Sequence, residues 1–135
     1  MSDPLKREQT DDAMAVVLAI QNELLTLDRE IPGQVVQMFL YIASHNPCHK
    51  QALEEDLGFS TASASRNSDW LSIHHRLKKA GLGLINKYPD PTNRRRQMFM
   101  LTPKGDELIH RIKEHINALA RSRRLLFQDS KDLEG

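Results

Sequence analysis

Three consecutive arginines, Arg94, Arg95 and Arg96, follow a turn-forming stretch in the segment "YPDPTNRRRQMFMLTPKG", residues 88–105. Adjacent guanidinium groups repel one another, and charged groups of this kind are costly to bury without partners. We therefore expect this turn to be exposed. Its arginines then either remain solvated or contact a polyanion.

Charge is unevenly distributed along the 135 residues, although the net charge is only +1. Residues 1–59 carry four basic and ten acidic side chains, whereas residues 60–105 carry nine basic and two acidic ones. One basic segment in a chain of balanced charge indicates a localised binding surface for a polyanion rather than general adhesiveness.

A run of small and polar residues, "FSTASASRN" (residues 59–67), precedes the arginines by about 25 positions. As the start of a helix, it would let the backbone approach DNA bases closely, with hydroxyl groups and methyl groups as base or phosphate contacts. Arg66 is suited to guanine and Asn67 to adenine. The alternative is a solvated, serine-rich helix start. The candidate DNA-binding residues are Ser60, Thr61, Ser63, Ala64, Ser65, Arg66 and Asn67 here, with Asn93, Arg94, Arg95 and Arg96 in the turn.

Hydrophobic periodicity and turn residues predict a mainly α-helical chain with one β-hairpin. Pro32 suits a first helical position, Gly58 a helix end, and Ser60 and Thr102 suit helix caps. The hairpin loop "PDPTN" is longer than a two-residue turn, so its tip should project. Expected helices span residues 11–28, 32–45, 49–58, 60–81 (with a possible break near Ser72) and 102–128, and expected strands span 84–88 and 95–101.

This order of elements predicts a winged helix-turn-helix. The helix that starts at Ser60 would enter the major groove through its N-terminal residues. The hairpin would then place its arginines in the minor groove or on flanking phosphates. Because side chains alternate along a strand, Arg95 should point away from Arg94 and Arg96, and at least one arginine should brace the wing.

From Lys50 to about Ile112 the chain resembles the MarR-type winged-helix transcriptional regulators. The segment "KAGLGLI" resembles the Gly-Leu motif before their wing, and "DPTNRRRQMFMLTPKG" resembles their wing signature. The resemblance implies that Arg95 reaches into the minor groove. It also implies a homodimer formed through helices in 1–30 and 106–128, around a helix-turn-helix and wing in 48–105. Two departures are Asn93, where the family has an aspartate, and extra residues around Ser72–His75.

The length indicates a single domain covering residues 1–135. The one cysteine, Cys48, and the polar N-terminus favour a cytoplasmic protein without a signal peptide. Cys48 lies near an expected helix start, where a thiolate can be favoured, although simple packing is the more common role. Neither the pair His74 and His75 nor the pair His45 and His49 has the spacing of a metal site. We expect no metal, no cofactor and no membrane span.

These features together predict a sequence-specific regulator of transcription, a repressor, that binds double-stranded DNA as a homodimer and is not an enzyme. The apolar stripes of the first and last helices exceed what one small winged helix covers, which also favours a dimer. Two alternatives remain open: a DNA-binding protein for replication or maintenance of a phage or plasmid, and a winged helix used only for protein partners. No residue specifies a small-molecule effector.

Overall fold

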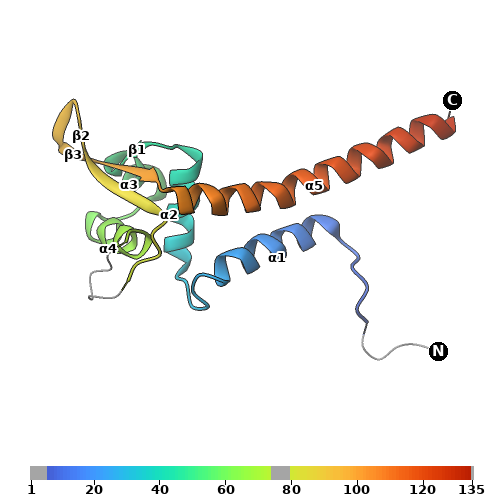
Figure 1. Cartoon of the computed structure of the whole chain (residues 1–135), viewed down its shortest axis with the longest axis horizontal. Coiled ribbons are helices and arrows are strands. Elements are labelled where there is room, and N and C mark those ends of the chain that lie inside the picture. Colours follow the sequence, from blue (N-terminus) through green and yellow to red (C-terminus); the bar gives the residue numbers. More distant parts are fainter. Residues whose placement is uncertain (1–5, 74–79, 135) are drawn as a thin grey trace.

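The computed structural model describes residues 6–73 and 80–134, and the side chains up to residue 128. The described residues form five helices and a small antiparallel sheet, so the prediction of a mainly α-helical winged-helix fold is confirmed (Figure 1). The elements are α1 (Asp12–Leu25), α2 (Gly33–Ser44), β1 (Cys48–His49), α3 (Lys50–Leu57), α4 (Thr61–Leu71), β2 (Ile85–Asp90), β3 (Asn93–Leu101) and α5 (Pro103–Glu134).

Side-chain caps set the starts of three helices. Asp11 accepts a hydrogen bond from the Met14 backbone at 3.0 Å, and Ser60 accepts one from Ser63 at 3.1 Å. Thr102 likewise accepts from the Gly105 backbone at 3.0 Å. Each cap satisfies a backbone N–H that has no partner inside its own helix. The caps predicted at Ser60 and Thr102 are therefore confirmed.

The start of α2 and the end of α3 also follow from local residues. Pro32 lies just before α2, whereas the sequence predicted it as the first residue of that helix. Gly58 ends α3 in the left-handed conformation, with φ of 69°. Glycine adopts this conformation without the steric cost that a side chain would bring, so the predicted stop at Gly58 is confirmed.

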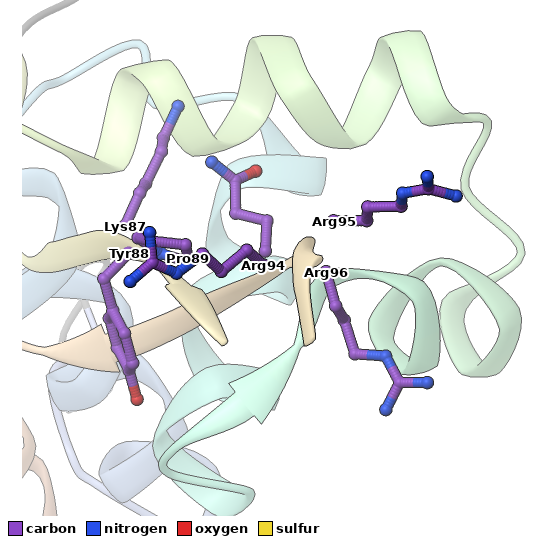
Figure 2. Close-up of a pocket in the computed structure, with 7 residues that line it drawn as sticks. Lys87, Tyr88, Pro89, Arg94, Arg95 and Arg96 are labelled. Carbon is purple, nitrogen blue, oxygen red and sulfur yellow. The ribbon is translucent and has the colours of Figure 1, made fainter. Parts of the chain in front are cut away.

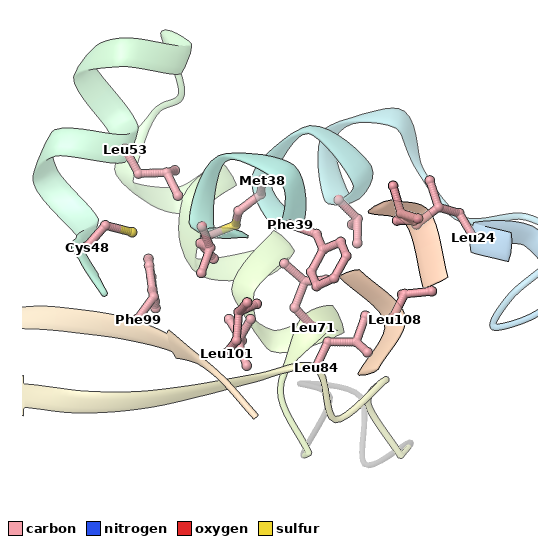
Figure 3. Packing of buried hydrophobic residues seen from close by; sticks show 14 residues of the cluster. Leu24, Met38, Phe39, Cys48, Leu53, Leu71, Leu84, Phe99, Leu101 and Leu108 are labelled. Atoms are coloured by element: carbon pink, nitrogen blue, oxygen red, sulfur yellow. The ribbon is translucent and has the colours of Figure 1, made fainter. Parts of the chain in front are cut away.

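The hydrophobic core gathers around α2 (Figure 3). Met38 and Phe39 of α2 are at most 1% exposed, and Leu71 of α4 and Phe99 of β3 are fully buried against the same cluster. Burial of one such side chain contributes about 1.5–3 kcal/mol. The core therefore fixes the orientation of α4 and of the hairpin relative to α2.

A third strand, β1, was not predicted. Cys48 pairs with Phe99 and His49 pairs with Met98, so the sheet order is β1-β3-β2. A two-residue strand is too short to carry a periodic pattern, so the sequence gives no signal for it. It ties the base of the hairpin to the start of α3.

Helix α4 is shorter than predicted. It ends at Leu71, and Ser72 takes an extended conformation, so the extension to Gly81 is wrong. The chain returns beside the helix end, where the Gly83 N–H donates to the Ser72 carbonyl at 3.1 Å. A Cβ atom on Gly81 would lie 1.8 Å from that carbonyl oxygen, so only glycine fits there. The possible break near Ser72 is where the helix stops.

Helix α5 packs beside α1 along its first half and then extends away from the rest of the fold (Figure 1). Glu23 of α1 joins the two helices. Its carboxylate lies 3.2 Å from Arg111 Nε and 3.2 Å from His115 Nε2 of α5. The hydrogen bond from His115 is the main cause that lowers the pKa of Glu23, and Arg111 adds to the effect.

These contacts predict a pH-dependent contribution to stability. A carboxyl group with a lowered pKa stabilises the fold above its ordinary pKa, and this stabilisation is lost as the pH falls through the lowered value. We expect Glu23→Gln to reduce the free energy of unfolding by about 1 kcal/mol at neutral pH. The difference should disappear in acid. Urea unfolding at fixed protein concentration measures it. Glu30→Gln, at an exposed residue, serves as the control, and equal losses from both variants would contradict the assignment.

Candidate nucleic-acid interface

Helices α3 and α4, with the turn at Gly58–Ser60, form the helix-turn-helix. The first two turns of α4 expose Thr61, Ala62 and Arg66, and Ser65 is half-buried beside them. Ser60, which caps the helix, is also exposed. This narrow face combines small side chains with hydroxyl groups and one guanidinium group. It has the chemistry that base edges and phosphates require.

Two residues predicted to contact DNA lie on the opposite face of α4. Ala64 is fully buried and Asn67 is 8% exposed, so neither is available to a base in this structure. They share a buried face with Ser68 and Leu71. The i, i+4 and i, i+7 spacing from Ala64 to Leu71 is a core pattern and was the signal that sequence reasoning missed. Ala62, which is exposed, takes the place of Ala64 on the outer face.

Ser63 and Asn67 instead hold a residue of α2. The side-chain oxygen of Gln34 accepts hydrogen bonds from Ser63 Oγ at 2.9 Å and from Asn67 Nδ2 at 3.1 Å. Gln34 lies 29 and 33 positions away in the sequence, and no local pattern marks it. The described structure therefore brings a third element to the edge of the helix-turn-helix.

The wing has a tighter turn than predicted. Asp90 pairs with Asn93, which leaves two residues, Pro91 and Thr92, at the tip. Asp90 Oδ1 accepts hydrogen bonds from the backbone N–H of Thr92 at 2.9 Å and from its hydroxyl group at 2.8 Å. Those bonds, the backbone one first, lower the pKa of Asp90, and His49 and Arg96 contribute further. A buried carboxylate thus closes the turn.

The three arginines occupy an irregularity in the hairpin. Pro89 pairs with Gln97, and the next pair is Asp90 with Asn93. Arg94, Arg95 and Arg96 lie between these pairs and have no register partner on β2. Such a bulge rotates side chains out of the regular alternation. Strand alternation alone therefore does not set the direction in which Arg95 points.

The three arginine side chains extend from the wing in different directions. Arg94 lies along Lys87, Tyr88 and Pro89, whereas Arg95 and Arg96 extend in other directions (Figure 2). Arg95 and Arg96 line one side of a groove, and residues of α3 and the start of α4 line the other. All three arginines are exposed. Arg95 therefore faces the same groove as Thr61 of α4.

Two polar contacts position the wing relative to the helices. Lys87 of β2 forms an ion pair with Asp69 of α4. Asp90, near the tip, lies with its Oδ2 atom 3.6 Å from Nδ1 of His49 in β1. Asn93 accepts a hydrogen bond from the backbone N–H of Arg95 at 3.2 Å, so it holds the Arg95 backbone. The charge of Arg96 contributes to the lowered pKa of Asp90, which makes Arg96 a candidate for the arginine expected to brace the wing.

Cys48 is packed rather than activated. Its side chain is 7% exposed, and burial raises the pKa of its thiol to about 11. Of the two roles that the sequence left open, the structure supports simple packing, because the thiol lies in the core beside β3 instead of at an open helix end.

Histidines do not form a metal site in the part of the chain that the structure describes. His45 stacks on Tyr41 with ring centroids 4.1 Å apart. His74 and His75 lie outside the described residues. Within residues 6–73 and 80–134, no three metal-binding side chains come together, and no helix is long and apolar enough to cross a membrane.

Comparison with known proteins identifies the fold. No protein-family model and no curated protein sequence matches the chain. Among solved structures, MarR is 22% identical with a TM-score of 0.53, over 90% of both chains. The transcriptional regulator Tm0710 from Thermotoga maritima is 20% identical with a TM-score of 0.59, over 90% of this chain and 84% of that chain. The MepR–DNA complex from S. aureus is 16% identical with a TM-score of 0.61, over 90% and 92%. At these identities the matches show a shared winged helix-turn-helix fold.

Burial and the raised pKa of the Cys48 thiol predict slow reaction with thiol reagents. With a pKa of about 11, the thiolate fraction at neutral pH is on the order of one in ten thousand, and burial blocks access as well. A chromogenic disulfide reagent should therefore label the native protein far more slowly than the urea-unfolded chain. Labelling of the native protein at the rate of an exposed cysteine peptide would contradict this structure of the β1 region.

Proposed function

We propose that this chain is a sequence-specific transcriptional regulator that binds double-stranded DNA as a homodimer and acts as a repressor. The observation that carries the proposal is the groove that the wing shares with α3 and the start of α4. Thr61, at the start of α4, and Arg95, on the wing, line it together. A helix face and an arginine-bearing hairpin at one end of a fold suit adjacent grooves of one duplex.

On this proposal the helix and the wing have different tasks. The outer face of α4, with Thr61, Ser65 and Arg66, enters the major groove and reads base edges. Arg95 enters the adjacent minor groove, and Arg94, which lies along Lys87 and Tyr88 of β2, contacts the phosphate backbone. Arg96, whose charge helps to lower the pKa of Asp90, supports the wing. The solved structures of MepR and AbfR bound to DNA support a DNA partner for this fold.

Exposed apolar side chains support the homodimer. Met14, Val17 and Leu18 of α1 are 55–60% exposed at i, i+3 and i+4 positions, which form one stripe. On α5, Leu125, Leu126 and Phe127 are 63–67% exposed. A second copy of the chain would cover these surfaces from both helices. Twofold symmetry would then present two α4 helices to half-sites about 34 Å apart.

Repression is the simplest output of such binding, because a dimer on an operator excludes other proteins from the same DNA. The proposal involves no catalysis, in keeping with the transcriptional regulators among the structural neighbours. The cytoplasmic location remains a prediction from the sequence. Use in phage or plasmid replication would rely on the same DNA contacts.

Selection of bound sequences from a random duplex pool tests the function. A palindromic consensus is expected, and the absence of any enrichment would contradict DNA recognition.

On the selected duplex, Arg95→Ala should weaken binding most, particularly with A/T-rich flanks. Arg94→Ala should weaken binding to all sequences and lower the slope of log affinity against log salt by about 1. Arg96→Ala should lower thermal stability most. Lys113→Ala, on the exposed surface of α5, is the control. Unchanged affinity and slope in all three arginine variants would mean that the wing does not touch DNA.

The dimer is tested by a charge placed in the exposed stripe of α1. Leu18→Glu should yield a monomer that keeps its helical content and binds the selected duplex much more weakly, because each half-site alone contributes too little. Ile73→Glu, at an exposed apolar residue 57% accessible and beyond α4, is the control and should leave the assembly unchanged. Light scattering distinguishes the two. A Leu18→Glu dimer of wild-type affinity would place the interface elsewhere.

A further inference from the structure

Gln34, the second residue of α2, stands at the rim of the α4 face proposed to read DNA. Its hydrogen-bond partner Ser63 lies between the buried and the exposed sides of α4. Arg66 follows Ser63 by three positions, and residues three apart are neighbours on a helix surface. Gln34 is itself exposed. The side chain therefore borders the outer face of α4 without belonging to the helix-turn-helix.

The orientation of the Gln34 amide group is fixed. Its oxygen accepts two hydrogen bonds, from Ser63 Oγ and Asn67 Nδ2, which uses both of its lone pairs. Asn67 Nδ2 also lies 3.4 Å from Ser63 Oγ, so the three side chains form a closed set. Asn67 is 8% exposed and cannot swing out without leaving the core. In place of the base contacts predicted from the sequence, Ser63 and Asn67 therefore hold Gln34.

A fixed amide group presents its nitrogen in a fixed direction. The oxygen faces α4, so the NH₂ group, with two donors, faces away from that contact. Among the described residues, no acceptor is bonded to Gln34 Nε2. Donors held in place before binding lose little entropy when they meet an acceptor.

We propose that Gln34 is a further DNA-contacting residue, whose Nε2 group donates to a backbone phosphate oxygen at the edge of the major groove that α4 occupies. The inference rests on the proposed DNA-binding function. Phosphate contacts from side-chain amides set the register and orientation of a protein on the duplex. Gln34 would thereby set how α4 enters the groove, with Ser63 and Asn67 as positioning residues.

The decisive variant is Gln34→Glu. A carboxylate keeps an acceptor for Ser63 and Asn67, so the contact between α2 and α4 persists, but the donor is lost. We expect an unchanged melting temperature and about tenfold weaker binding to the selected duplex. Gln37→Glu adds the same charge one turn further along α2, at another exposed residue, and should weaken binding clearly less. Gln34→Ala removes both the acceptor and the donor, so it should lose both stability and affinity.

Each outcome has one interpretation. Equal loss of affinity by Gln34→Glu on all duplex sequences supports a phosphate contact, and a changed base preference at one position per half-site places the donor on a base edge instead. Wild-type affinity of Gln34→Glu, or a loss matched by Gln37→Glu, overturns the contact. Loss in Gln34→Ala alone would make Gln34 a support for α4 only, which also overturns it. If the wild-type chain selects no duplex, the proposed function fails together with this inference, whereas failure of Gln34 alone leaves the function standing.

Discussion

The packing of α4 against α2 is the constraint on which the binding surface depends. Ala64, Ser68 and Leu71 are fully buried on the inner face of α4. Ser68 satisfies its hydroxyl group by donating to the carbonyl of Ser65 at 2.8 Å, so a polar side chain is tolerated in the core. Once these three residues face inward, helical geometry leaves only the side bearing Ala62 and Arg66 to meet a ligand.

The wing is held in a different way from α4. Its base is anchored by the buried Phe99 and Leu101, but residues 91–96, toward the tip, are exposed and have no core of their own. Polar contacts position this part: Lys87 with Asp69, and Asp90 with Thr92. A net hydrogen bond contributes less than the burial of a large apolar side chain. Helix α4 is therefore held mainly by apolar packing, and the outer part of the wing by local polar contacts.

Sequence reasoning identified the elements better than the directions of their side chains. Periodicity and capping residues predicted the order of helices and the hairpin, because these signals are local. The end of α4 at Leu71 depends on backbone contacts with residues 81–84, and β1 depends on pairing with Phe99. Gln34 reaches Ser63 and Asn67 only in the folded chain. Arg94–Arg96 were found by composition, but the bulge that divides them follows from register, which the sequence pattern does not contain.

Several acidic side chains near the interface have partners within the fold, whereas Glu55 of α3 is exposed and lines a hollow together with Arg96. Residues 60–105 contain two acids: Asp69 pairs with Lys87, and Asp90 accepts both hydrogen bonds from Thr92. Glu54 lines the groove opposite Arg95, and its Oε1 atom lies 3.3 Å from Nζ of Lys50. Both side chains are at least four-fifths buried. Because an ion-paired carboxylate projects little field beyond its partner, Asp69 and Glu54 oppose a polyanion only weakly. The positive potential of the exposed arginines therefore acts on whatever occupies the groove.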